Sequence, residues 1–203
     1  MTITQTIDLG IRRATTTDRR AVAAIIAAGF FDDPVTRWLL PHVDRRRDVI
    51  LPMFELYADA YLRHGQTYLT TDGNGAAVWL PPNAELLTQD QEQAFGEAVA
   101  DILGPDADRV FQLEEIFAEH HPTGPLYYCQ FLSTVPAFQG RGIGSALLQD
   151  VLQRADTEGI PAYHEATSPR NRALYERHGY VSQGELTLPQ GGPTLWRMWR
   201  NPR

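Results

Sequence analysis

The sequence contains no lysine, because all 18 of its basic residues are arginines. It therefore offers no lysine side-chain amine for modification. We interpret the exclusive use of arginine as the mark of a GC-rich bacterial coding sequence. Cysteine is almost absent as well: Cys129 stands alone, which excludes an internal disulfide. Its place in an apolar, strand-like pattern favours a packed small side chain over a reactive thiol.

Long apolar runs are missing too. No stretch approaches the about 20 residues that a membrane-spanning helix requires, and residues 1–10 lack the basic and then apolar pattern of a signal peptide. We therefore expect a cytoplasmic protein without membrane association. The formal net charge of -7 at pH 7 argues against a nucleic-acid partner. The length of 203 residues fits a single domain spanning 1–203.

Hydrophobic periodicity predicts a chain that mixes strands and helices. Helices are indicated where apolar side chains recur every three or four residues, and strands by short apolar runs between turn residues. Helices are predicted after residues 15–18, around Trp38 and over 49–61. Two more occupy 85–119 on either side of Gly104–Pro105, and the last two cover 143–159 and 173–178. The predicted strands cover 10–14, 67–71, 76–80, the stretch from Leu126 to Pro136, 161–166, 180–188 and 194–199.

Three features leave alternatives open. Pro52 lies within a helical pattern and predicts either a kink or a helix that begins near the proline. Residues 85–119 contain ten acidic residues and one basic residue, Arg109. Such a segment is either a solvated outer face or an acidic wall that draws a cationic amine toward a site. The strand with Trp196 and Trp199 fits the core or an interface, so we expect a monomer or a homodimer.

The central stretch of the sequence begins as a strand at Leu126, stops at Pro136 and leads into the loop QGRGIGS, residues 139–145. A helical pattern follows directly. A glycine-rich loop at a helix N-terminus forms a cradle for phosphate groups. Gly140 and Gly142 let a ligand approach the backbone, and Arg141 is placed to add a charge-assisted contact. The alternative is a turn that serves helix packing alone.

Two well-known phosphate-binding loops differ from this one. The glycines are spaced G-x-G-x-G, whereas dinucleotide-binding domains use G-x-G-x-x-G. Fewer than 40 residues follow Glu165, too few for the rest of a dinucleotide-binding domain. A P-loop is excluded because no Gly-Lys-Ser/Thr sequence follows the glycines. We therefore interpret the loop as a pyrophosphate cradle of another kind.

Further motifs accompany the loop. The segments LSTVP at 132–136 and QGRGIG at 139–144 are followed by Asn171 and Tyr175, ahead of the pair GY at 179–180. Together they resemble the GNAT superfamily of acyl-CoA-dependent N-acyltransferases. The stretches PAYHEATSPRNRALYERHGY and PTLWRMWR are similar, more narrowly, to puromycin N-acetyltransferase and its relatives. The strong motifs begin at Leu126, and the N-terminal half matches only in the order of its elements.

The resemblance implies a fold and a co-substrate. The expected architecture is the GNAT fold, an α/β (α+β) arrangement with a mixed, mostly antiparallel sheet of about seven strands flanked by helices. The sheet is expected to splay where the central strand meets its neighbour. The co-substrate is acetyl-CoA, and no metal is expected, because three nearby metal ligands are not evident. The implied acetyl-CoA-binding residues are Leu132, Ser133, Thr134, Gln139, Gly140, Arg141, Gly142, Ile143, Gly144, Ser145 and Asn171.

The resemblance also implies individual roles. Backbone groups of residues 132–134 would face the pantetheine arm and the thioester, and one N–H would polarise the acetyl carbonyl. Asn171 would hydrogen-bond the pantetheine arm; alternatively, it caps the helix that carries Tyr175. Tyr175 would protonate the leaving thiolate as general acid. The alternative for Tyr175 is a side chain that packs on the sheet.

The general base is the least constrained role. The attacking amine must be neutral, so a group has to accept its proton. We assign Glu165, which ends the strand beside the expected cofactor cleft, and keep Glu114, Glu115 and His120 as alternatives. His164 is interpreted as an ordinary strand histidine.

Tyr128 and Gln130 are two residues apart and therefore share one face of the central strand. We predict that both line the pocket of the acceptor.

The function expected from these residues is acetyl transfer from acetyl-CoA to a primary amine of a small molecule, in a ternary complex without a covalent enzyme intermediate. An antibiotic or an aminonucleoside-like compound is the kind of acceptor that the narrower resemblance implies. One alternative is an acetyltransferase for a protein N-terminus or lysine. The other is a non-catalytic acyl-CoA-binding module. Fold-level resemblance does not choose among acceptors.

Overall fold

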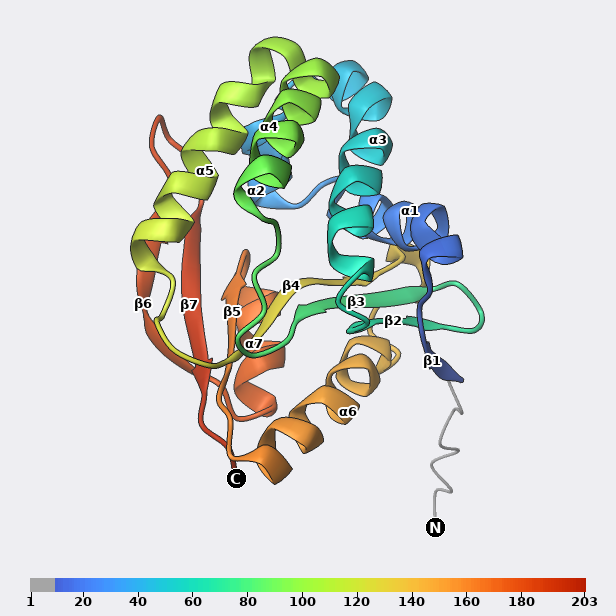
Figure 1. The fold of residues 1–203 in the computed structure, drawn as a ribbon, viewed down its shortest axis with the longest axis vertical. Helices are drawn as coiled ribbons and strands as arrows, with labels where there is room; N and C mark the ends of the chain where they lie inside the picture. Colours follow the sequence, from blue (N-terminus) through green and yellow to red (C-terminus); the bar gives the residue numbers. More distant parts are fainter. Residues whose placement is uncertain (1–9) are drawn as a thin grey trace.

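The computed structural model describes residues 10–203 and is centred on a seven-stranded sheet (Figure 1). The strand order is β1-β2-β3-β4-β5-β7-β6, and in this described part β4 and β5 form the only parallel pair. The strands are β1 (Ile11–Arg13), β2 (Thr67–Thr70), β3 (Gly75–Leu80), β4 (Tyr127–Thr134), β5 (Ala162–Ala166), β6 (Val181–Thr187) and β7 (Thr194–Arg200). The predicted mixed, mostly antiparallel sheet is confirmed. The expectation about a signal peptide concerns residues that, except for Gly10, lie outside the described part.

Helices cover both faces of this sheet (Figure 1). One face carries α1 (Arg19–Phe30), α2 (Pro34–Leu39), α3 (Val43–Leu62), α4 (Gln89–Leu103) and α5 (Ala107–His120). The other face carries α6 (Ile143–Glu158) and α7 (Pro169–Arg177). Short 3-10 turns occupy Thr16–Asp18, Gly104–Asp106 and Pro136–Phe138. Within residues 10–203, none of the helices combines the length and the apolar character that crossing a membrane requires.

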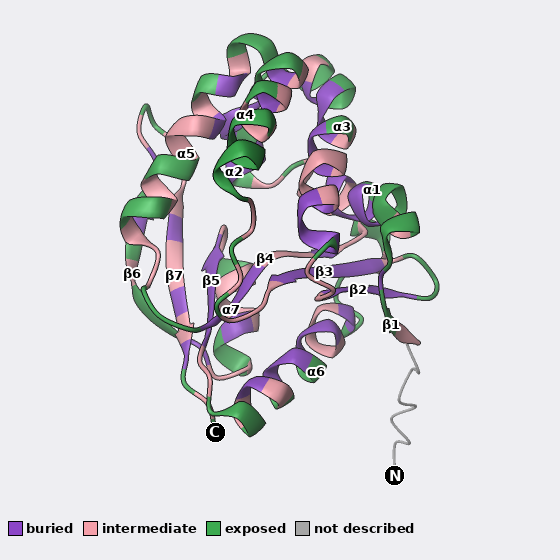
Figure 2. Ribbon diagram, viewed as in Figure 1, coloured by how far each residue is buried: buried purple, intermediate pink, exposed green. Residues whose placement is uncertain are grey.

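The two faces of the sheet hold separate parts of the core. Ala76 and Val78 of β3 pack with the α1–α5 helices, whereas Ala77 and Trp79 pack with α6. Successive strand residues point to opposite faces, so one continuous apolar run serves both clusters. Figure 2 shows β3 buried along most of its length.

Helix α3 runs through Pro52 rather than starting beside it. It begins at Val43, so the alternative of a helix that begins near the proline is wrong. The proline removes one N–H donor from the helix interior. The predicted apolar face of α3 is buried, and it brings Met53 and Phe54 against the core beneath α1.

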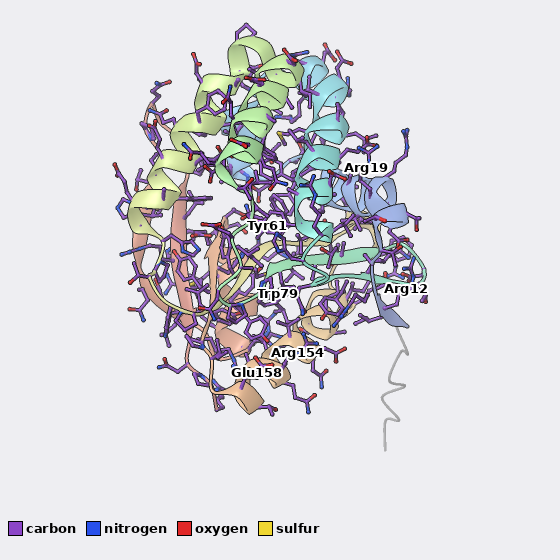
Figure 3. All side chains as sticks on the ribbon, viewed as in Figure 1. Arg12, Arg19, Tyr61, Trp79, Arg154 and Glu158 are labelled. Atoms are coloured by element: carbon purple, nitrogen blue, oxygen red, sulfur yellow. The ribbon has the colours of Figure 1, made fainter. Side chains whose placement is uncertain are left out.

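Helix α6 is attached to the sheet by polar contacts as well as by its apolar face. Arg154 donates a hydrogen bond to Gln66 Oε1 at 2.7 Å, and the hydroxyl of Tyr127 donates to Glu158 at 2.7 Å (Figure 3). Near the end of the helix, Asp156 forms a bidentate pair with the guanidinium of Arg200, with both contacts at 2.7 Å. These contacts set the position of α6, and with it the position of the glycine loop that precedes it.

A bulge interrupts β4 at Gln130. Val78 pairs with Phe131 and Trp79 pairs with Cys129, so Gln130 has no partner on β3. An extra residue of this kind bends a strand and increases its local twist. The bulge also breaks the alternation of side chains, because Gln130 and Phe131 line the same cavity.

The parallel pairing of β4 with β5 ends next to this bulge. The strands pair at Tyr127–Ala162 and Tyr128–Tyr163 and then diverge. The predicted splay is therefore present. Beyond this point the Cys129 carbonyl has no backbone N–H of β5 to pair with. Nδ1 of His164 lies 2.6 Å from this oxygen and serves as the donor instead.

Close packing of α1 on β4 predicts that Gly29 tolerates no side chain. A Cβ at Gly29 would lie 2.2 Å from Ser133 Oγ and 3.1 Å from the Thr134 carbonyl oxygen. We expect Gly29→Ala to lower the free energy of unfolding by about 1–3 kcal/mol. Gly96 in α4 is the matched control, since a Cβ there meets nothing within 4 Å.

Gly96→Ala should leave stability unchanged or raise it by up to about 1 kcal/mol through helix propensity. Urea denaturation of both variants makes the measurement. Equal stability of the two variants would show that α1 does not need this close approach.

Candidate functional site

Two cavities meet at the divergence of β4 and β5. The glycine-loop cavity lies between β4, the start of α6 and the face of α7, and has a cavity volume of about 290 Å³. The apolar cavity lies between the sheet and helices α2, α3 and α5, and has a cavity volume of about 90 Å³. Four residues line both cavities: Phe30, Leu132, Asn171 and Tyr175.

The glycine-loop cavity has backbone groups on one side. Gly140 and Gly142 have φ values of 77° and 85°, which glycine adopts without strain. A Cβ at either position would have no described atom within 4 Å, so it would project into open space in front of the loop. Ile143, Gly144 and Ser145 form the first turn of α6, whose N–H groups have no partner inside the helix. These N–H groups and the helix dipole suit a pyrophosphate.

Arginines of α7, rather than of the loop, bring positive charge to this cavity. Arg170 and Arg177 line it, and Arg170 donates to Gln139 Oε1 at 2.9 Å. Arg141 is not among its lining residues. Its guanidinium lies 3.3 Å from the Ala137 carbonyl and 5.0 Å from the ring centre of Phe138. The other residues that the resemblance assigns to acetyl-CoA all line the glycine-loop cavity.

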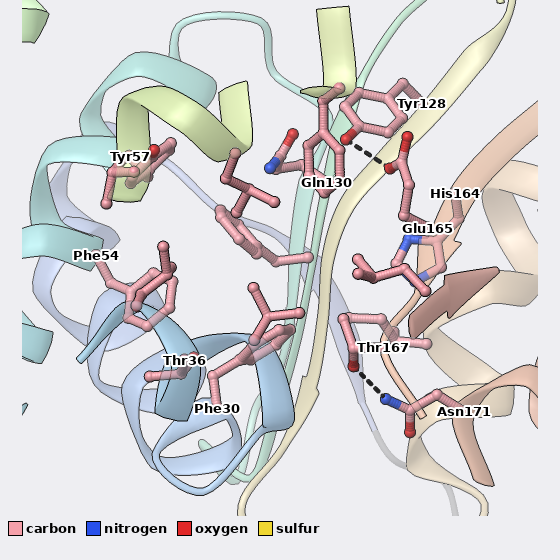
Figure 4. Close-up of a pocket in the computed structure, with 18 of the residues that line it drawn as sticks. Phe30, Thr36, Phe54, Tyr57, Tyr128, Gln130, His164, Glu165, Thr167 and Asn171 are labelled. Carbon is pink, nitrogen blue, oxygen red and sulfur yellow. Dashed lines mark hydrogen bonds between the residues drawn. The ribbon is translucent and has the colours of Figure 1, made fainter. Parts of the chain in front are cut away.

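Asn171 lies in the first turn of α7, and its amide is oriented by neighbours. Ser168 is the N-cap, because its side chain accepts a hydrogen bond from the Asn171 N–H, so the alternative that Asn171 caps the helix is wrong. Nδ2 of Asn171 donates to Thr167 Oγ1 at 3.1 Å (Figure 4). Thr167 in turn donates to Asp33 at 2.5 Å. Since a hydroxyl has one proton, Thr167 can only accept from Asn171.

Asp33 connects this chain of hydrogen bonds to α2. Its other oxygen accepts from the N–H of Val35 at 2.9 Å, which caps α2. Burial raises the pKa of Asp33, while the Thr167 hydrogen bond acts in the opposite direction. One carboxyl group therefore contacts both the residue that orients Asn171 and the helix that forms a wall of the apolar cavity.

Tyr175 is buried where the two cavities meet. Its ring lies against the imidazole of His164, with 4.2 Å between the ring centres. Burial raises the pKa of the phenol well above its usual value, so the hydroxyl is protonated at neutral pH. Among residues 10–203 it has no hydrogen-bond partner, and it is free to serve a ligand. The ring does pack on the sheet, as the alternative interpretation expected, but it also lines both cavities.

His164 lines the apolar cavity and has a defined tautomer. A carbonyl oxygen only accepts, so Nδ1 must carry the proton that is shared with Cys129. Burial lowers the pKa of His164 to about 4, so the ring is neutral at neutral pH. The sequence interpretation of an ordinary strand histidine missed this position. Ala162 and Ala166 share a strand face with His164, and their small size indicated that this face is buried. No sequence pattern indicated that β4 and β5 diverge beside His164.

Glu165 is a buried carboxyl in the wall of the apolar cavity. Oε2 accepts a hydrogen bond from the hydroxyl of Tyr128 at 2.8 Å (Figure 4), and Oε1 is buried without a partner in the described part of the chain. Burial raises the pKa of Glu165 to about 7, whereas Tyr128, Tyr163 and Arg197 act to lower it. A carboxylate with such a pKa can accept a proton near neutral pH.

The alternative bases lie elsewhere. Glu114, Glu115 and His120 are not among the residues that line the apolar cavity. Glu114 accepts a hydrogen bond from Tyr57 at 2.8 Å, and Nδ1 of His120 lies 2.8 Å from a carbonyl of its own helix. Tyr128 and Gln130 do line the cavity, as predicted. Tyr61 donates to Gln130 Oε1 at 2.7 Å, so the amide N–H₂ of Gln130 remains available to the cavity.

Sequence reasoning also missed Arg170, Arg177 and Thr167. Residues 168–171 were predicted as a loop and helix start, with the helix itself at 173–178. The true start at Pro169 puts Arg170, Asn171, Leu174 and Arg177 on one helical face, a spacing that the PRNRALYER segment already contains.

Comparison with known proteins agrees with this geometry. Residues 89–182 match the family model described as an acetyltransferase (GNAT) domain. An uncharacterised N-acetyltransferase of Schizosaccharomyces pombe is 22% identical over 200 residues, covering 89% of this chain and 77% of the relative.

Two solved structures extend the similarity to nearly the whole chain. A Corynebacterium glutamicum protein described as histone acetyltransferase HPA2 and related acetyltransferase has a TM-score of 0.74 and 26% identity, covering 96% of each chain. Arylalkylamine N-acetyltransferase 2 of Aedes aegypti has a TM-score of 0.66 and 15% identity, covering 95% of this chain and 98% of that one. The chain therefore has the GNAT fold, and its residues 89–182 are similar to a GNAT acetyltransferase domain.

Proposed function

We propose that this protein transfers the acetyl group of acetyl-CoA directly to the primary amine of a small molecule. The observation that carries the proposal is the meeting of two cavities at Leu132, Asn171 and Tyr175. One cavity has the backbone donors and arginines that suit a pyrophosphate, and the other is walled by side chains around a single carboxyl group. Two substrates held in these cavities would meet without a covalent enzyme intermediate.

The residues of the glycine-loop cavity suit acetyl-CoA, which when bound supplies an activated acetyl thioester. Backbone N–H groups at the start of α6, with Arg170 and Arg177, would hold the pyrophosphate. The oriented amide of Asn171 presents its oxygen as an acceptor for an N–H of the pantetheine arm. Residues 132–134 of β4 would provide backbone groups beside the thioester, including an N–H that polarises the carbonyl.

Two side chains move protons in the proposed reaction. Glu165 accepts the proton that the amine loses as the bond from nitrogen to the acetyl carbon forms. Tyr175 donates a proton to the sulfur as the carbon–sulfur bond breaks. The products are an N-acetylated amine and free CoA thiol, and the enzyme is restored when Glu165 releases its proton to solvent and the Tyr175 phenolate takes one up. The buried, protonated state of Tyr175 and the raised pKa of Glu165 both suit these roles.

Two rival functions make different demands. A non-catalytic acyl-CoA-binding module needs neither Glu165 nor the apolar cavity that opens on Tyr175. A protein acetyltransferase has the support of the Corynebacterium glutamicum structure, which is described as a histone acetyltransferase. The narrower resemblance to puromycin N-acetyltransferases supports the inclusion of aminonucleosides among the test substrates.

Thiol release with acetyl-CoA and a panel of amines tests the proposed function. The panel contains aminonucleosides, aminoglycosides, simple alkyl and aryl amines, polyamines and short lysine peptides. We expect release with small primary amines, and Tyr175→Phe should reduce kcat by about a hundredfold or more. Release with peptides alone would favour the protein acetyltransferase. Acetyl-CoA binding by calorimetry without any thiol release would favour the binding module.

The pKa of Glu165 predicts the pH profile of the reaction. The carboxylate form is required, so kcat/KM should rise with pH through an inflection near 7. Tyr128→Phe removes a hydrogen bond that favours the ionised carboxylate, so the inflection should move to higher pH. Glu165→Gln should lose this inflection together with about a hundredfold in kcat/KM. An inflection that stays near 7 in Glu165→Gln would assign the base to another group.

The hydrogen bonds of Thr167 predict an effect on the co-substrate. Thr167→Val frees the amide of Asn171 to rotate, so the KM for acetyl-CoA should rise about three- to tenfold while kcat changes less. Thr167→Ser keeps the hydroxyl and should restore the KM.

Thr157→Val, on the solvent side of α6, is the matched control and should leave both constants unchanged. A KM in Thr167→Val equal to that of Thr157→Val would show that Asn171 is held by other contacts.

A further inference from the structure

The apolar cavity is rich in aromatic rings on the side away from Glu165. Phe30 and Phe54 lie edge-on to Phe131, with ring centres 5.7 and 5.3 Å apart and interplanar angles of 82° and 88°. Tyr57 meets the same ring at 5.6 Å and 90°. Figure 4 shows Phe30, Phe54 and Tyr57 facing the polar side chains of β4 and β5 across the cavity. These aromatic contacts pre-form a surface that suits a flat or apolar group.

The remaining walls are aliphatic. Helices α2, α3 and α5 and strand β7 contribute six apolar side chains, Val35, Leu39, Met53, Val110, Leu113 and Leu195, and Thr36 of α2 adds one hydroxyl group but no charge. A cationic or strongly polar group in this part of the cavity would lose its water without gaining a charged partner.

Ionisable groups are scarce in the cavity. Among the described residues, Glu165 is the only carboxyl group in its lining, and His164 is neutral because burial lowers its pKa to about 4. The acidic residues of 85–119 do not line it; Glu114, whose pKa is raised by burial, lies behind the lining residue Tyr57 and accepts a hydrogen bond from its hydroxyl. The exposure of most of these residues fits a solvated face, and the attraction of a cationic amine by the segment stays a prediction. The cavity can pair one ammonium group.

We propose that the acceptor is an amine with a single cationic nitrogen on an apolar, ring-bearing body. This rests on the proposed function and narrows it: the nitrogen lies near Glu165, and the body fills the space between the aromatic cluster and α5. A polyamine would place its second ammonium among aliphatic side chains. A lysine peptide would place amide groups there. Both leave buried polar groups unpaired, which the cavity walls cannot compensate.

Matched amines test this inference on the wild-type chain. Hexylamine and hexane-1,6-diamine have the same carbon chain and differ in the second charge. 2-Phenylethylamine and propylamine differ in the ring, and a short peptide with a blocked N-terminus and one lysine supplies the peptide arm. The readout is kcat/KM for thiol release with saturating acetyl-CoA.

We expect hexylamine to exceed hexane-1,6-diamine by at least about thirtyfold, because an unpaired buried charge is disfavoured. 2-Phenylethylamine should exceed propylamine by about tenfold or more. The lysine peptide should be slower than both apolar amines. Equal or higher kcat/KM with the diamine or the peptide would overturn the inference and leave the proposed acetyl transfer intact. Thiol release with none of the amines would contradict both.

A variant of the cavity wall provides the converse test. Leu113 is only partly buried, so a longer polar side chain can be accommodated at this position. Leu113→Glu adds a second carboxylate and should raise the diamine-to-monoamine ratio of kcat/KM about tenfold or more. Leu113→Gln is the matched neutral control and should leave the ratio within about threefold of the wild type. Equal ratios in the two variants would contradict a diamine whose second charge lies beside α5.

Discussion

The hydrogen bond from His164 to the carbonyl of Cys129 is the interaction on which the site depends. Two strands that separate inside a protein expose backbone groups, and an unpaired buried carbonyl costs about 1–3 kcal/mol. A side chain of β5 satisfies the carbonyl of β4, so the strands can diverge directly after the Tyr128–Tyr163 pair. The bulge at Gln130 bends β4 at the same place. Both cavities open from this divergence, and the ring of Tyr175 packs against the imidazole of His164 at a tilt of 37°.

The glycine-loop cavity and the apolar cavity are lined by different kinds of chemical groups. The glycine-loop cavity uses backbone N–H groups, positive-φ glycines and the start of a helix, features that a short motif can specify. The apolar cavity uses side chains from α1, α2, α3, α5 and three strands, brought together by packing. Asp33 links the cavities, because one carboxyl caps α2 and also holds Thr167, which orients Asn171. The two cavities therefore share a boundary that is held by hydrogen bonds.

Particular residues show how far sequence reasoning reached. The glycine loop, Tyr128, Gln130, Glu165 and Tyr175 were placed correctly around the cavities, since each lies in or beside a regular element whose pattern is clear. Arg141 was expected to face the phosphate site, but it stacks on Phe138, and the arginines that line the cavity belong to α7. Phe131 was missed because a bulge breaks the alternation on which facing predictions rest.

The sequence by itself determined the order of the elements, the glycine-rich loop of residues 139–145 ahead of a helix and the resemblance to acyl-CoA-dependent transferases. These depend on local backbone preferences and on spacing within short segments, which are readable without a partner. Only the tertiary structure decided that His164 pairs with Cys129, that Glu165 is buried with a pKa of about 7, and that one carboxyl lines the apolar cavity. Desolvation and pairing depend on which distant side chains surround a group, and that arrangement exists only after the chain has folded.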